Sequence, residues 1–119
     1  MKKLTPLPKL LAKAQKIFNA YIRERDKDLG CISCGGEVNQ AGHYFSQGHH
    51  SILRFDEMNV NGQCVRCNMF LSGNLIKYRM GLIERYREDA VQDLELIGLQ
   101  NKSKKWTRAE LEDIINTYK

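Results

Sequence analysis

The sequence predicts an α+β fold in which a small core of short strands is flanked by helices. Residues 1–29 and 74–119 repeat apolar side chains at helical spacing, which predicts helices on either side of a central segment. That segment, residues 30–73, contains every cysteine and histidine and most of the glycines. Because 119 residues suit one modest core, we expect a single domain over residues 1–119.

The first predicted helix spans residues 6–28 and is amphipathic. Its apolar stripe consists of Leu7, Leu10, Leu11, Ala14, Ile17, Phe18, Tyr21 and Ile22. Thr5 is its expected N-cap and Gly30 its expected end. Lysine and arginine fill many remaining positions, and a solvated face or a DNA-backbone contact are equal alternatives for this basic surface.

Further helices are expected toward the C-terminus. Residues 74–98 predict two helices, and a basic linker then leads to a last helix over residues 107–119. Thr107 and Glu110 have the spacing of a capping box, which marks the start of that helix. Trp106 precedes it and is expected to dock the helix rather than to stack on a base.

The central segment predicts two short strands and a short helix. Residues 37–46 and 51–55 can each form a strand. Residues 57–64 are then expected to lead into the second cysteine turn, and residues 66–73 to begin a helix that ends at Ser72 and Gly73.

Composition favours a polyanionic partner and gives no membrane signal. The net charge is +5 and the isoelectric point about 9.1, a balance common among nucleic-acid binders. No apolar run approaches the ~20 residues that a membrane span needs. The N-terminal stretch "MKKLTPLPKLL" lacks the long apolar region of a signal peptide, so we expect neither secretion nor membrane insertion.

The four cysteines form two pairs with the pattern Cys-x2-Cys-x29-Cys-x2-Cys. They are Cys31, Cys34, Cys64 and Cys67. Two such turns supply the four thiolates of a tetrahedral zinc site, and a closed shell of this kind is structural. The alternative, a redox pair, needs a thioredoxin-like βαβ setting that the predicted order of elements does not provide. We therefore expect a structural Zn²⁺ that staples the core.

One histidine and two asparagines lie between and beside the cysteine pairs. His43 falls in the first predicted strand, Asn59 follows sixteen residues later, and Asn68 directly follows the last cysteine. This arrangement resembles the HNH nuclease family in its HNN variant, whose fold is a ββα-metal core often bracketed by zinc turns. The resemblance implies a zinc-stapled ββα-metal core and hydrolysis of phosphodiester bonds.

The resemblance also implies a role for each of these residues. His43 would be the general base, because a histidine near neutral pKa can take a proton from water. Asn59 would orient that histidine, and Asn68 would be a ligand of a catalytic divalent ion, Mg²⁺ or Mn²⁺. Arg54, Arg66 and Lys77 are expected to contact DNA phosphates.

One position departs from the HNH pattern. In many of these enzymes the residue before the base is an aspartate or histidine that also binds the ion, whereas here it is Gly42. A second protein ligand must therefore come from elsewhere. The candidates are Gln40, His49, His50, Asp56, Glu57 and Ser72. For His49 and His50 an exposed loop is the preferred interpretation, and Asn74 is expected to cap the next helix rather than to bind metal.

A narrower resemblance covers residues 8–98. The motifs "AGHY", "LRF", "N-x-x-GQC-x-x-CN" and "SGN-x-x-x-YR-x-GLI" are similar to the NinG family, also called Rap, recombination proteins of lambdoid phages and prophages. The glycine–histidine pair belongs to this pattern. The resemblance implies nuclease action on branched DNA, such as recombination intermediates, in the cytoplasm of the bacterial host.

We therefore expect a metal-dependent DNA endonuclease. The alternative is a non-catalytic zinc-stabilised module that binds DNA or a recombination partner. Branched DNA often presents two equivalent strands to cut, so a homodimer would suit the task.

Overall fold

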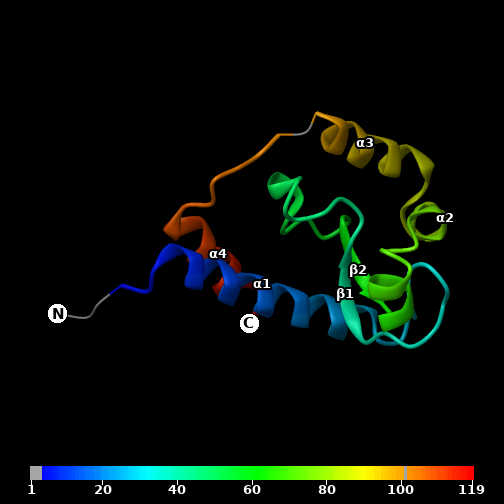
Figure 1. The fold of residues 1–119 in the computed structure, drawn as a ribbon, viewed down its shortest axis with the longest axis horizontal. Helices are drawn as coiled ribbons and strands as arrows, with labels where there is room; N and C mark the ends of the chain where they lie inside the picture. The colour runs from blue at the N-terminus through cyan, green and yellow to red at the C-terminus, as the bar shows by residue number, and fades with distance from the viewer. Residues whose placement is uncertain (1–3, 101) are drawn as a thin grey trace.

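The computed structural model describes residues 4–100 and 102–119, and it is a helix-rich α+β structure. Its elements are α1 (Leu7–Asp26), β1 (Gln40–His43), the 3-10 turn η1 (Ser51–Leu53), β2 (Val60–Gln63), the π-helical turn η2 (Arg66–Phe70), α2 (Leu75–Tyr86), α3 (Glu88–Leu99) and α4 (Arg108–Tyr118). The long helix α1 is the base of the molecule (Figure 1). The strands lie against its C-terminal half, and α4 packs beside its N-terminal half.

The two strands form an antiparallel hairpin in which Gln40 pairs with Gln63 and His43 with Val60. The prediction of a strand over residues 51–55 is wrong, because Leu53 and Phe55 turn toward two different apolar clusters. The second strand, β2, instead lies within residues 57–64, the segment expected only to lead into the second cysteine turn. Its polar side chains are buried and hydrogen-bonded internally, so it lacks the alternating pattern that identifies a half-exposed strand.

The first apolar cluster joins α1 to α4. The Phe18 ring meets those of Phe55 and Tyr118 edge-on, at centroid distances of 5.7 and 4.8 Å. Trp106 packs edge-on against Phe55, and its Nε1 donates a hydrogen bond to the Ser51 carbonyl at 3.0 Å. Trp106 thus docks the last helix, as predicted.

The second cluster joins α2 and α3 to the cysteine-bearing segment. Its buried members are Ile32, Leu53, Tyr78, Leu82, Val91 and Leu94. Tyr78 is fully buried, and its hydroxyl donates to the Gly42 carbonyl of β1 at 2.7 Å. Gly81 lets α2 approach the first cysteine turn closely, because a Cβ at this position would collide with the Ile32 carbonyl oxygen. The hairpin is therefore held between α1 on one side and α2 on the other.

A buried carboxylate ties the end of α1 to β2. Asp26 accepts hydrogen bonds from Arg25 Nε at 2.7 Å and from the Gly62 amide at 2.7 Å. Burial alone would raise the pKa of Asp26, but these hydrogen bonds and the nearby arginines lower it below its usual value. Asp26 therefore stays ionised and fixes the hairpin on the helix.

The helix starts follow the predictions in part. Thr107 and Glu110 form the predicted capping box of α4. The prediction of Thr5 as the N-cap of the first helix is wrong. The N-cap is Pro6, and α1 begins at Leu7. Among the helices of the described residues, none is long and apolar enough to cross a lipid bilayer.

Candidate functional site

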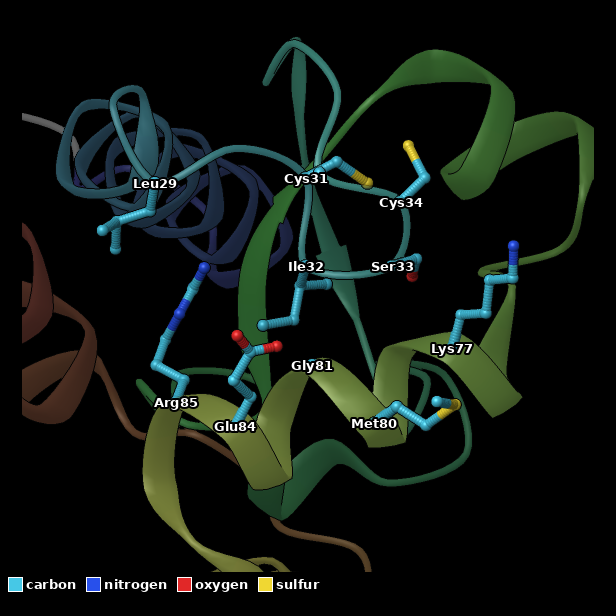
Figure 2. Close-up of a pocket in the computed structure, with 11 residues that line it drawn as sticks. Leu29, Cys31, Ile32, Ser33, Cys34, Lys77, Met80, Gly81, Glu84 and Arg85 are labelled. Atoms are coloured by element: carbon cyan, nitrogen blue, oxygen red, sulfur yellow. The ribbon is translucent and has the colours of Figure 1, made fainter.

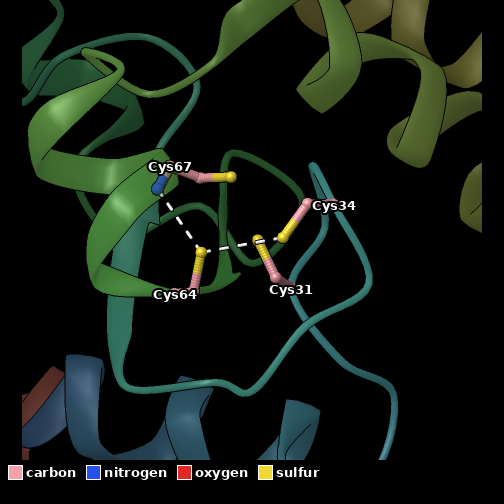
Figure 3. Close-up of side chains that lie close together, drawn as sticks. All are labelled: Cys31, Cys34, Cys64 and Cys67. Atoms are coloured by element: carbon pink, nitrogen blue, oxygen red, sulfur yellow. Dashed lines mark hydrogen bonds between the residues drawn. The ribbon is translucent and has the colours of Figure 1, made fainter.

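Two turns bring the four cysteine sulfurs together, as Figure 3 shows. All four sulfurs lie within 4.8 Å of one another. Cys34 Sγ is 3.6 Å from Cys64 Sγ, close to the about 3.8 Å expected between sulfurs of a tetrahedral zinc site with Zn–S bonds of about 2.3 Å. The predicted cysteine cluster is confirmed, and its geometry is consistent with a structural zinc ion.

Hydrogen bonds from the surrounding chain favour the thiolate form of two of these cysteines, whereas burial raises the pKa of Cys67 to about 12. The amides of Gly36 and Cys67 donate to Cys34 Sγ and Cys64 Sγ, both at 3.4 Å. The hydrogen bond from the Cys67 amide is the main reason that the pKa of Cys64 is lowered to about 7. Such partners orient metal ligands and tune their basicity.

Asn74 also serves the cysteine cluster rather than the helix that follows it. It occupies the N-cap position of α2, but its backbone is left-handed, with φ 47° and ψ 57°. The side chain therefore does not cap the helix, and its Nδ2 donates to Cys67 Sγ at 3.4 Å. The prediction of Asn74 as a capping residue is thus wrong at the level of the side chain.

His43 ends β1, and its ring has one defined hydrogen-bond partner. Its Nε2 lies 3.1 Å from the Arg54 carbonyl oxygen. A carbonyl only accepts, so Nε2 carries the proton and Nδ1 has the free lone pair. Burial lowers the pKa of His43 below 6.5, although the Arg54 carbonyl acts in the opposite direction. The ring is therefore neutral at pH 7, with Nδ1 able to accept a proton.

Asn59 fixes the loop that supplies this carbonyl. It is fully buried, and its Nδ2 donates to the carbonyls of Phe45 and Leu53 at 3.0 and 3.1 Å. Its Oδ1 accepts from the Phe45 amide at 2.8 Å. Because Leu53 immediately precedes Arg54, Asn59 determines where the carbonyl that binds His43 lies.

Asn68 lies in η2 and faces β1. Its Nδ2 donates to Gln40 Oε1 at 2.8 Å, which turns its Oδ1 away from Gln40. His43 and Asn68 line one shallow cavity of about 350 Å³. The other lining residues include Asn19, Ser46, Gln47 and Ser72. Two of the three predicted catalytic residues therefore share a cavity. Asn59 holds the loop whose Arg54 carbonyl lies against His43.

The six candidates for a second ion ligand divide into two groups. Gln40, which accepts from Asn68, and Ser72, which lines the cavity, lie beside the site. Asp56 instead accepts hydrogen bonds from the amides of Met58 and Asn59, both at 2.9 Å, and so closes a turn.

The remaining three candidates lie in other surroundings. Glu57 accepts from the hydroxyls of Tyr21 and Tyr118, at the junction of α1 and α4. His49 is exposed in the loop after β1, in agreement with the preferred interpretation. His50 is partly buried, with its ring centroid 5.0 Å from that of Phe45.

The structure adds Gln63, a residue that no spacing pattern in the sequence indicates. It is fully buried on β2, and its Oε1 has no hydrogen-bond partner among the described residues. A Cβ at Gly42 would collide with this oxygen and would come within 2.9 Å of Asn68 Oδ1. The motif "GQC" does not indicate a role for Gln63. The sequence does not show the strand register that brings the Gln63 side chain next to Gly42.

The three expected DNA contacts lie in different environments. Arg54 is half-buried, and its Nε donates to Gln15 Oε1 on α1 at 2.7 Å, so its side chain has an internal partner. Arg66 is exposed on η2 and Lys77 on α2. Lys77 borders a second cavity of about 680 Å³, between the first cysteine turn and α2, where Arg85 also points (Figure 2). DNA contact by these residues stays a prediction.

Comparison with known proteins identifies the family. A family profile described as "Bacteriophage Lambda NinG protein" matches residues 1–119. The chain belongs to the NinG family. It is 44% identical to "Protein ninG" of Salmonella phage P22 over 118 residues, which cover 97% of this chain and 57% of the relative. "Protein ninG" of Escherichia phage lambda is 42% identical over 118 residues, 97% of this chain and 56% of that protein.

The chain thus spans little more than half the length of the NinG proteins that it matches. No solved structure is significantly similar to it. The predicted membership of this phage family is confirmed, and the motifs that predict it lie on the two strands, at η1, on η2 and on α2.

Proposed function

We propose that this NinG protein is a metal-dependent DNA endonuclease of the HNH type. The observation that carries the proposal is the shared cavity of His43 and Asn68, where the histidine is neutral and has Nδ1 free to accept a proton. The order β1, β2, η2, with the first cysteine pair before β1 and the second pair at the start of η2, agrees with a ββα-metal core. Zinc would be the scaffold of this core and a second ion would take part in the reaction.

The chemistry is hydrolysis of a phosphodiester bond. A water molecule attacks phosphorus, the bond from phosphorus to the leaving oxygen breaks, and His43 Nδ1 accepts the proton of the attacking water. Asn59 holds the Leu53 carbonyl, which keeps the neighbouring Arg54 carbonyl on His43 Nε2 and so preserves the reactive tautomer. A divalent ion such as Mg²⁺ or Mn²⁺, held by Asn68, would supply positive charge for the phosphate and the leaving oxygen.

The cysteine turn supports this site directly. Cys67 and Asn68 are adjacent in η2, so the turn that binds zinc also sets the direction of the Asn68 carboxamide. A change in the cysteine cluster would therefore move an oxygen at the cavity. This connection supports a common function for the two sites, in which one ion holds the geometry that the other needs.

The substrate that we propose is branched DNA formed during phage recombination in the bacterial host. The support is the membership of the phage NinG family together with the net charge of +5. Arg66 on η2, two residues before Asn68, and Lys77 on α2 are exposed cations and would contact phosphates. A homodimer would allow two strands of a branch point to be cut in one encounter.

Cleavage of a branched DNA by the zinc-loaded protein tests the proposal. We expect the wild type to cut in the presence of Mg²⁺ or Mn²⁺, and His43→Ala to lose about 10²-fold or more in rate, since a general base contributes about that much. His49→Ala is the matched control, because His49 is an exposed histidine of the adjacent loop. Equal cleavage by wild type and His43→Ala would exclude His43 as the base.

A second candidate function is a non-catalytic zinc module that binds DNA or a recombination partner. The basic charge and the cysteine cluster suit a binder equally well. Such a module has no chemical need for a neutral histidine beside Asn68. Binding of branched DNA without cleavage under any divalent metal would favour this second candidate.

A further inference from the structure

Gln63 presents a buried oxygen that needs a positively charged or hydrogen-bonding partner. Its side chain is fully buried in β2, and its Oε1 is one of two buried side-chain atoms without a partner among the described residues. Leaving such a group unsatisfied costs about 1–3 kcal/mol. A native protein keeps an unpaired buried oxygen when a water, an ion or a ligand completes it.

The direction of this oxygen is set by the other half of the same carboxamide. Gln63 Nε2 donates to Ser33 Oγ at 2.9 Å and to the Gly73 carbonyl at 2.8 Å. Reversing the carboxamide would place an oxygen against the Gly73 carbonyl oxygen. The Nε2 hydrogen bonds therefore hold Oε1 toward β1.

Asn68 directs a second carbonyl oxygen to the same place. Its Nδ2 donates to Gln40 Oε1, so Oδ1 is the free end of the group. Gln63 Oε1 and Asn68 Oδ1 both lie within 2.9 Å of the point where a Cβ of residue 42 would stand. Two amide oxygens that converge in this way create a local negative potential without any formal charge.

Gly42 makes this convergence possible. Any side chain at residue 42 would displace Gln63 Oε1 and crowd Asn68 Oδ1. Gly42 has an ordinary strand conformation and pairs with Asn61. A glycine is therefore needed here because there is no room for a Cβ, and not because of a special backbone conformation.

We propose that Gln63 Oε1 and Asn68 Oδ1 together bind the catalytic divalent ion, with Gln63 as the second protein ligand. This inference rests on the proposed nuclease function. Hard cations such as Mg²⁺ and Mn²⁺ accept neutral carboxamide oxygens as ligands. The ion would enter past Asn68, which lines the cavity that it shares with His43. The oxygen that an acidic side chain at residue 42 would supply thus comes from the opposite strand.

Binding of Mn²⁺ to the zinc-loaded protein, followed by the electron paramagnetic resonance signal of free Mn²⁺, tests the inference. Gln63→Leu removes the oxygen, and we expect it to weaken Mn²⁺ binding about tenfold or more, in the range found for residues that support metal sites. Gln63→Glu keeps an oxygen and adds a negative charge, so it should bind Mn²⁺ at least as tightly as the wild type.

Ser33→Ala is the matched control. It removes one acceptor of Gln63 Nε2 but leaves Oε1 in place, so its Mn²⁺ affinity should stay close to that of the wild type. Zinc content and thermal unfolding of each variant show whether it is folded. Wild-type Mn²⁺ affinity in folded Gln63→Leu would overturn the inference, and it would mean that a water molecule completes Oε1.

A measurement on the wild type covers the case in which Gln63→Leu does not fold. In crystals of the wild type soaked in Mn²⁺, the anomalous manganese peak should lie within bonding distance of both Gln63 Oε1 and Asn68 Oδ1. A manganese peak bonded to Asn68 but not to Gln63 would overturn the inference.

The outcomes separate the inference from the proposed function. If wild type and folded Gln63→Leu bind Mn²⁺ and cleave DNA equally well, the nuclease proposal stands and the role of Gln63 is wrong. If the wild type neither binds Mn²⁺ nor cleaves DNA, both proposals are wrong.

Discussion

The candidate site depends on the direction in which three carboxamides face. Asn59 uses both ends of its side chain to hold the loop between the strands. The side-chain amide nitrogens of Asn68 and Gln63 donate to internal acceptors, and their oxygens are therefore directed toward Gly42. In the proposed ion site, neutral amides would therefore perform the orienting and electrostatic tasks that carboxylates perform in many metal sites, without the repulsion of adjacent negative charges.

Protonation of His43 should make cleavage depend on pH. Burial disfavours the imidazolium form of His43 and lowers its pKa below 6.5, so the basic form is already present at neutral pH. Cleavage should fall as the pH decreases through this pKa and should level off above it. We expect a kcat/KM profile at saturating divalent metal whose acidic limb has a pKa below 6.5. A limb centred at or above 6.5 would contradict the role assigned to buried His43.

The residues that the sequence predicts well are those whose spacing alone defines a site. The cysteines have two-residue gaps that force each pair into one turn, and the structure brings them together. Gln63 could not be predicted in this way. Its proximity to Gly42 and Asn68 follows from strand register and from the absence of a Cβ, and neither is visible in a linear pattern.

The secondary-structure elements differ in how strongly local sequence determines them. The helices α1 and α4 follow from apolar repeats and, in α4, from a capping box. The sequence pattern does not predict the strand Val60–Gln63, because three of its four residues are not apolar. Its Asn61 and Gln63 are buried only because Met58, Tyr78, Ser33 and Gly73 supply partners from other elements.

Removal of zinc tests how far these elements depend on the cysteine cluster. The central segment, residues 30–73, has few buried apolar side chains of its own, so metal binding and its folding should be coupled. Chelation should collapse the dispersed amide resonances of residues 31–73 in a ¹⁵N correlation spectrum. Complete loss of zinc, verified by elemental analysis, with an unchanged spectrum would contradict this coupling.

At the scale of the whole molecule, two apolar clusters hold the hairpin between α1 and α2 (Figure 1). The return of α4 to α1 completes the first cluster, and Glu57 receives hydroxyl hydrogen bonds from both helices. This long-range pairing had no signal in the sequence beyond the apolar face of each helix. The apolar face of α4, with Leu111 and Ile115, is consequently buried within the chain.

The proposed mechanism assigns two ions to two tasks. The cysteine cluster holds the turn that carries Asn68, and the cavity beside His43 is where a second ion would assist hydrolysis.

The most direct test is anomalous X-ray diffraction from crystals of the zinc-loaded protein soaked in Mn²⁺. Data collected on both sides of the zinc edge and near the manganese edge distinguish the two metals. We predict a zinc peak among Cys31, Cys34, Cys64 and Cys67, and a separate manganese peak bound by Asn68 Oδ1 in the cavity that His43 lines. A fully soaked crystal with no manganese at Asn68 would contradict the proposal that this NinG protein holds a catalytic ion beside its histidine.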